Sequence, residues 1–329
     1  MDISPRLKRL LFAALALSFL PAIAGWLLAG WVFAPNPTPV RALPDDLPGE
    51  TITLSTTDAV NLRAWYLPPA GEPLAGVLLL HCRGCNRGAM LARGRFLLGE
   101  GYAVLIPDLR GEGESDAARR GMGMYEVQDV DAALFELRRR LGDKPIAIVG
   151  RSKGAAAAVY AHAEVDALVL ESLYRDFESA IEHRLVANHG EWAGVLTPLV
   201  AGPLAFGAKL NRYRANPGGH LGNIKTPVLL MAGDRDELIP WHETQELFAA
   251  AAGPKQLWRI AGAGHVDAYD HAPGEWQAQV GPFLRDAFAR RASTQTGAAN
   301  PPPRDLPIGM PADVPADVPA DLPIPFNPD

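Results

Sequence analysis

The stretch Gly150-Arg151-Ser152-Lys153-Gly154 follows the apolar run 145–149 and precedes the alanine-rich run 155–163. The first run is typical of a buried strand and the second of a helix, so Ser152 is predicted at a sharp strand-to-helix turn. Neighbouring backbone approaches the serine closely in such a turn, and glycine on either side leaves the room. The hydroxyl is then exposed at a helix N-terminus, where free N–H groups stabilise negative charge. The pattern predicts a nucleophilic serine.

Strand-length apolar runs continue on both sides of this turn and alternate with longer helical segments. Strands that are apolar on both faces and separated by helices indicate an α/β fold with a mostly parallel sheet, covered by helices on both faces. A hairpin precedes them, and the whole domain is expected over 51–291. The hairpin strands are 51–55 and 61–67, the other strands 77–80, 103–106, 146–149, 167–170, 228–231 and 256–260, and the clearest helices 124–141, 241–252 and 275–290.

The connection from Leu170 to Val228 is too long for a simple crossover between strands. It is expected to hold a small helical insertion over 173–222 that covers Ser152 as a lid. Its apolar residues have two interpretations, the lining of an acyl pocket or a satellite core under the insertion. These residues are Trp192, Leu196, Leu199, Leu204 and Phe206.

Residues 1–34 are predicted to be a membrane anchor or a signal sequence. Basic residues at 6, 8 and 9 precede an uncharged apolar run over 10–33, which is long enough to span a bilayer. The alternative is a signal peptide cleaved after the small residues 22–24. Both interpretations export the rest of the chain, so an extracytoplasmic domain is expected, either anchored to the membrane or secreted.

The segments flanking the domain differ from it in composition. Residues 35–50 are proline-rich and are expected to be a linker, and residues 292–329, rich in Pro, Ala and Asp, are expected to be a disordered tail. The apolar fraction of 48% suffices for a large core. The net charge of −6 argues against nucleic acid as a partner. The oligomeric state does not follow from the sequence.

A nucleophilic serine needs a histidine to take its proton and an acid to orient that histidine. His265 lies in a glycine-containing turn directly after the last strand, where it can reach across the strand ends, and His271 is a weaker second candidate. The acid is expected in the loop after the preceding strand, which offers Asp234 and Asp236. Physical reasoning alone does not separate these two carboxylates.

Four further sequence blocks occur in the order typical of the α/β-hydrolase superfamily, which the chain resembles over about 51–290. Within that superfamily, the chain is most similar to the membrane-anchored serine hydrolases of the BEM46-like and ABHD13/ABHD17-like type. The resemblance implies an eight-stranded sheet and favours Asp236 as the acid, with Asp234 as the alternative. It also implies that the backbone amides of Arg83 and Lys153 form the oxyanion hole. The blocks are 80–86, 107–115, 233–240 and 263–265.

Two residues depart from the family's pattern. Cys82 stands where glycine is usual, and with Cys85 it is a hypothetical redox pair whose disulfide tunes the oxyanion loop; the alternative is a small apolar pair packed beneath the loop. Lys153 stands where a neutral side chain is usual, and its charge is expected to favour an acidic substrate group or to depress the basicity of His265.

Taken together, the sequence predicts a serine esterase or thioesterase that works through Ser152, His265, Asp236 and an acyl-enzyme. Its substrate is expected to be a small-molecule or lipid-like acyl compound, and no metal or organic cofactor is implied. A serine peptidase of the prolyl-oligopeptidase type and a catalytically silent binding protein with the same fold are the alternatives.

Overall fold

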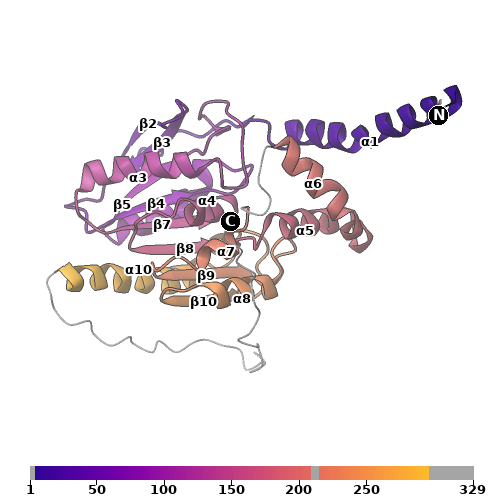
Figure 1. Ribbon diagram of the computed structural model, residues 1–329. Helices are drawn as coiled ribbons and strands as arrows, with labels where there is room; N and C mark the ends of the chain where they lie inside the picture. The colour runs from indigo at the N-terminus through magenta and orange to yellow at the C-terminus, as the bar shows by residue number, and fades with distance from the viewer. Residues whose placement is uncertain (1–3, 209–214, 296–329) are drawn as a thin grey trace.

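An eight-stranded sheet lies at the centre of the computed structural model, which describes residues 4–208 and 215–295 (Figure 1). The strand order is β10-β9-β8-β7-β4-β5-β3-β2. β3 pairs antiparallel with β2 and β5, whereas all other neighbouring strands are parallel. The predicted eight-stranded, mostly parallel sheet is confirmed. Its strands are β2 (Glu50–Ser55), β3 (Asn61–Leu67), β4 (Gly76–Leu80), β5 (Ala103–Pro107), β7 (Ile146–Arg151), β8 (Ala167–Glu171), β9 (Val228–Gly233) and β10 (Lys255–Ile260).

Helices cover both faces of the sheet, because the central strands are apolar on both sides. Along β4, Leu78 and Leu80 belong to one hydrophobic cluster and Val77 and Leu79 to another. The first cluster includes side chains of α3, α4 and α8, and the second includes side chains of α2 and α10. These helices are α2 (Leu91–Gly99), α3 (Val127–Leu141), α4 (Lys153–Tyr160), α8 (Trp241–Ala250) and α10 (Pro273–Gln295).

The long connection between β8 and β9 contains a helical insertion, as predicted. Its described elements are α5 (Phe177–His189), the 3-10 helix η2 (Glu191–Leu196), α6 (Thr197–Gly207) and α7 (Pro217–Leu221). A third hydrophobic cluster joins α5 and α6 to the N-terminal helix α1 (Pro5–Val32). In Figure 1, α1 extends outward from the body of the protein beside α6.

The contact between α1 and α6 is close. A Cβ atom at Gly25 would lie 2.0 Å from the Cβ of Pro203, and one at Gly207 would lie 2.7 Å from the Cα of Trp26. Glycine at both positions therefore allows the helix backbones to approach. Larger side chains there would force the helices apart.

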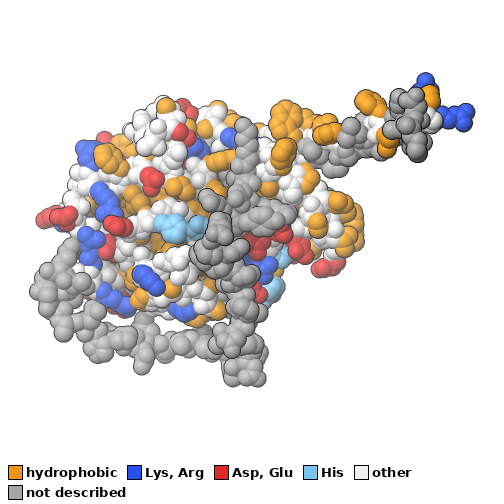
Figure 2. Space-filling model, viewed as in Figure 1, with side chains coloured by type: hydrophobic (Ala, Val, Ile, Leu, Met, Phe, Trp, Pro, Cys, Tyr) orange, Lys and Arg blue, Asp and Glu red, His pale blue; other side chains and the backbone are white. Residues whose placement is uncertain are grey.

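The predicted membrane span over 10–33 is not supported. Within residues 4–208 and 215–295, the structure contains no helix with both the length and the apolar character needed to cross a membrane. Gly25 and Ala29 of this helix are instead buried against the protein, as is Phe33 directly after it. Other apolar side chains of α1 are exposed, and Figure 2 shows hydrophobic side chains over this helix.

The segment expected as a linker contacts the domain at its start. β1 (Asn36–Pro37) forms a two-residue parallel pairing with β6 (Glu112–Gly113), and the Asn36 N–H donates to the Gly111 carbonyl at 2.6 Å. The predicted disordered tail begins too early, because α10 continues to Gln295, and residues 296–329 lie outside the described part of the chain. Its disorder stays a prediction.

Candidate active site

The turn at Ser152 has the geometry that the sequence predicts. β7 ends at Arg151 and α4 begins at Lys153, and between them Ser152 has a φ of 48°, which is rare for a residue other than glycine. A Cβ atom at Gly154 would lie 2.4 Å from the Leu80 carbonyl oxygen, and one at Gly150 would lie 2.6 Å from the Ala155 nitrogen. Both contacts are too short for a side chain, so glycine is required on either side of the serine.

Ser152, His265 and Asp236 lie together at the carboxyl ends of the strands. The Nε2 atom of His265 lies 3.1 Å from the Ser152 Oγ atom. Its Nδ1 atom lies 2.9 and 3.0 Å from the two carboxylate oxygens of Asp236. These distances form a continuous chain of hydrogen bonds from the carboxylate to the hydroxyl.

The structure distinguishes the two candidate acids by their partners. The Asp236 carboxylate is buried and also accepts the backbone N–H groups of Leu238 and Ile239, at 3.0 and 2.9 Å. Asp234 instead accepts the Gly262 N–H at 2.7 Å and does not contact His265. Asp236 is thus held by the loop in the one orientation that meets His265.

His271 lies outside this group of residues. Its Nε2 atom contacts the Ala261 carbonyl at 3.0 Å, and its side chain is exposed. The second candidate for the base is therefore not placed near Ser152.

The predicted oxyanion donors are the backbone amides of Arg83 and Lys153. Lys153 is the first residue of α4, so its amide has no acceptor within the helix. Within the described part of the chain, the Arg83 amide donates no hydrogen bond, and the neighbouring Gly84 N–H donates to Glu112 at 2.6 Å. Both amides are therefore free to donate to a bound oxygen.

Comparison with known proteins identifies the superfamily. The uncharacterized protein Rv2307c of Mycobacterium tuberculosis is 31% identical over 244 residues, which cover 72% of this chain and 79% of that protein. The protein-family profile described as Hydrolase_4, serine aminopeptidase S33, matches residues 71–173. The esterase Pf2001 of Pyrococcus furiosus has a similar structure, with a TM-score of 0.64, 26% identity and coverage of 77% of this chain and 97% of that one. The chain is an α/β-hydrolase.

A more distant relative of this hydrolase is the lysophosphatidylserine lipase ABHD12 of Danio rerio. It is 25% identical over 238 residues, which cover 62% of this chain and 59% of that protein. The superfamily is thus shown, whereas the narrower BEM46-like and ABHD13/ABHD17-like type stays a prediction.

The side chain of Lys153 forms ion pairs inside this hydrolase. It is buried, with Nζ paired to Glu112 and lying 3.3 Å from Glu126 Oε1. Burial alone would lower the Lys153 pKa, but the charges of Glu126 and Glu112 outweigh it and raise that pKa. The charge that the sequence analysis assigned to substrate recognition is therefore neutralised inside the protein.

Replacing Lys153 with methionine is expected to lower the free energy of unfolding by about 3–5 kcal/mol, because two buried carboxylates lose their shared cation. Urea denaturation measures this change. Lys144→Met is the matched control, since Lys144 pairs at 2.8 Å with the exposed Glu72 and should show no measurable change. Equal losses in the two variants would contradict the structural role of Lys153.

Cys82 and Cys85 form a disulfide that closes the loop carrying the Arg83 amide. The loop is also fixed by Glu112, which accepts the Gly84 N–H with one oxygen and pairs with Lys153 through the other. Glu112 thereby connects both segments that supply the predicted oxyanion donors. The sequence analysis missed this residue, although it lies within a block that carried the family resemblance.

The double variant Cys82→Ser/Cys85→Ser is expected to lower kcat for ester hydrolysis by about tenfold, because the loop loses a covalent restraint on its amide donor. Steady-state kinetics measure this loss, and reduction and alkylation of the unmodified protein should reproduce it. Unchanged turnover, with both thiols shown to be free by mass spectrometry, would refute a role for the disulfide in this loop.

The pocket at Ser152 of this hydrolase is narrow, with a volume of about 20 Å³. Ligand pockets typically enclose about 300–1,000 Å³, so a substrate can enter after neighbouring side chains move. The apolar residues proposed for an acyl pocket do not line it: Leu204 belongs to the satellite core with α1, Leu196 is half-buried elsewhere, and Trp192, Leu199 and Phe206 are exposed. The lining is instead Met122, Ser152, Tyr174, Ala180, Arg184, Leu238, Ile239 and His265.

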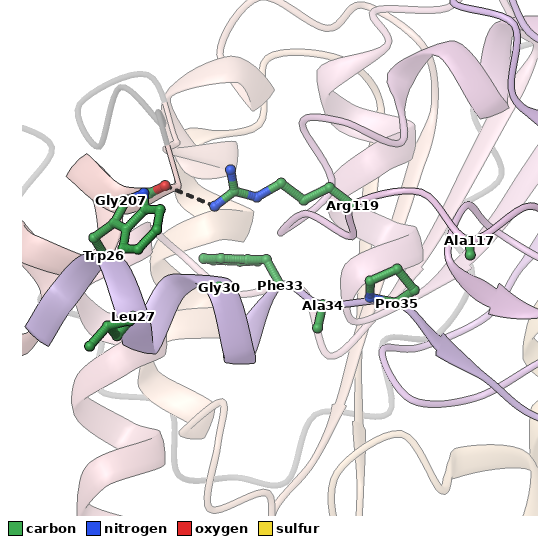
Figure 3. Close-up of a pocket in the computed structure, with 9 residues that line it drawn as sticks. All are labelled: Trp26, Leu27, Gly30, Phe33, Ala34, Pro35, Ala117, Arg119 and Gly207. Carbon is green, nitrogen blue, oxygen red and sulfur yellow. Dashed lines mark hydrogen bonds between the residues drawn. The ribbon is translucent and has the colours of Figure 1, made fainter. Parts of the chain in front are cut away.

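A larger cavity, of about 510 Å³, lies between α1, α6 and the loop before α3 (Figure 3). Phe33 lies on its floor, and Arg119 crosses it to donate to the Gly207 carbonyl at 2.9 Å. Neither Ser152 nor His265 lines this cavity. The larger cavity is therefore separate from the pocket at Ser152.

Proposed function

We propose that this protein is a serine hydrolase that cleaves carboxylic ester or thioester bonds through an acyl-enzyme. One observation carries the proposal, the continuous chain of hydrogen bonds from Asp236 through His265 to Ser152. A carboxylate, an imidazole and a hydroxyl in this order are the parts that nucleophilic acyl transfer requires.

In this mechanism His265 removes the proton from Ser152 as the hydroxyl oxygen attacks the carbonyl carbon. The amides of Arg83 and Lys153 donate to the oxygen of the tetrahedral intermediate. His265 then protonates the leaving alcohol or thiol, and water releases the acyl group by the same steps. Asp236 holds the imidazole with Nε2 toward the serine and stabilises its charged form.

The similar proteins support an acyl substrate. One similar structure is an esterase and one relative is a lysophosphatidylserine lipase, both α/β-hydrolases. The exposed apolar side chains of α1 are compatible with a lipid-like substrate and with the membrane-associated type that the sequence resembles.

A peptidase is the second candidate function, because the matching family profile is described as a serine aminopeptidase. A substrate panel separates the two: p-nitrophenyl esters of increasing chain length, acyl thioesters and peptide amides, each with the wild type and Ser152→Ala. Turnover of esters or thioesters that Ser152→Ala abolishes supports the proposal. Turnover of peptide amides alone would replace it, and no turnover by folded protein would favour a binding role.

We also propose an extracytoplasmic location. The Cys82–Cys85 disulfide supports an oxidising compartment, and the basic start of the chain followed by an apolar run supports export. Cleavage after Ala24 would retain Gly25, Ala29 and Phe33, which are buried against the body. N-terminal sequencing of the mature protein after cell fractionation tests both export and cleavage.

A further inference from the structure

Arg184 differs from the rest of the Ser152 pocket. It lies on α5, in the insertion that covers the strand ends, and its side chain lines the same pocket as Ser152 and His265. The other lining residues are apolar or neutral apart from the histidine: Met122, Tyr174, Ala180, Leu238 and Ile239. Among the described residues, Arg184 is therefore the one arginine, lysine or carboxylate residue that lines this pocket.

The Arg184 guanidinium has no protein acceptor. Among residues 4–208 and 215–295, no side chain or carbonyl forms a hydrogen bond or an ion pair with it, although α5 carries carboxylates at 178 and 182. The Arg184 side chain is exposed to solvent. The segment 209–214, Lys-Leu-Asn-Arg-Tyr-Arg, contains no acidic residue.

Arg83 lies among several charged side chains. Lys153 and Arg120 share the carboxylate of Glu112, and Lys153 also contacts Glu126. Arg83 donates to the carbonyl of Val32, a neutral group. Burial and the charges of Arg120 and Arg184 lower the pKa of Arg83 to about 10. Arg83 and Arg184 thus add positive charge, which the carboxylates of Glu112 and Glu126 offset only in part at Arg83.

We infer that Arg184 binds an anionic group of the substrate, a carboxylate or a phosphate, beside the ester bond that Ser152 attacks. This inference rests on the proposed hydrolase function and narrows its substrate class. A guanidinium forms paired, charge-assisted hydrogen bonds with either anion. An exposed arginine that no described carboxylate holds is available to bind such an anion.

Two pairs of substrates test this inference. The first compares p-nitrophenyl butyrate with mono-p-nitrophenyl succinate, which adds a carboxylate on the acyl side. The second compares monooleoylglycerol with oleoyl lysophosphatidic acid, which adds a phosphate on the alcohol side. We expect the wild type to prefer the anionic member of at least one pair by about tenfold or more in kcat/KM, and the preferred pair identifies the anion.

Arg184→Gln is expected to reduce that preference at least tenfold, mainly through KM, and Arg184→Glu to reverse it. Arg41→Gln is the matched control, since Arg41 is an exposed arginine that does not line the pocket, and thermal unfolding verifies that each variant is folded. Equal turnover within both pairs by the wild type would overturn the inference, and so would an unchanged preference in Arg184→Gln. Hydrolysis of the neutral esters would still support the proposed function in either case. Absence of all ester turnover would overturn both.

Discussion

Replacing His265 with alanine is expected to lower kcat for ester hydrolysis by about 10⁴- to 10⁶-fold, because a serine hydroxyl without a base is a poor nucleophile. His265 is the one histidine whose ring nitrogen lies within hydrogen-bond distance of Ser152 Oγ in the described structure, at 3.1 Å. Steady-state kinetics on a p-nitrophenyl ester measure the loss.

His271→Ala is the matched control for this variant. His271 lies in the same loop region, but its ring contacts a backbone carbonyl instead of the serine. Its replacement is expected to change kcat by no more than a few-fold. A larger loss in His271→Ala than in His265→Ala would show that His271, and not His265, is the base.

Replacing Asp236 with asparagine is expected to lower kcat by about 10⁴-fold, with folding largely retained. The asparagine amide fills the same space but favours the histidine tautomer with its proton on Nε2, so the ring cannot accept the serine proton. In the structure, Nδ1 of His265 contacts the buried Asp236 carboxylate, and Nε2 contacts Ser152. The same kinetic assay measures the effect.

Asp234→Asn tests the alternative acid, because the residues alone did not separate Asp234 from Asp236. Asp234 fixes the loop before His265 through the Gly262 N–H, so its replacement is expected to affect stability more than kcat. A loss of kcat near 10⁴-fold in Asp234→Asn, with Asp236→Asn close to wild type, would exchange the roles of the two carboxylates.

The features that depend on short-range sequence were predictable. Ser152 lies in a turn whose glycines are required by contacts of 2.4 and 2.6 Å, and the strands on both sides are continuous apolar runs. The position of His265 followed because it comes directly after the last strand of the sheet. Local sterics and strand order therefore determine most of the fold and two of the three proposed catalytic residues.

Features that depend on long-range packing were not predictable from the residues. The choice of Asp236 over Asp234 depends on which carboxylate the amides of Leu238 and Ile239 hold. The direction of the Lys153 side chain depends on Glu112 and Glu126, which are distant in sequence.

The apolar run at the N-terminus was interpreted as a membrane span because periodicity cannot reveal that Gly25 and Ala29 pack on α6. Arg184 gave no signal in the sequence, since its significance lies in the absence of a partner within the fold. The position of Arg184 beside Ser152 depends on how the insertion packs over the strand ends, which the sequence does not show.

The central claim is that Ser152 is the nucleophile, and covalent labelling tests it most directly. Protein treated with a fluorophosphonate is digested, and the modified peptide is located by mass spectrometry, with Ser152→Ala in parallel. The account predicts one phosphonate adduct, on Ser152, and none in the variant. Folded wild-type protein that stays unlabelled, or an adduct on another serine that persists in Ser152→Ala, would contradict it.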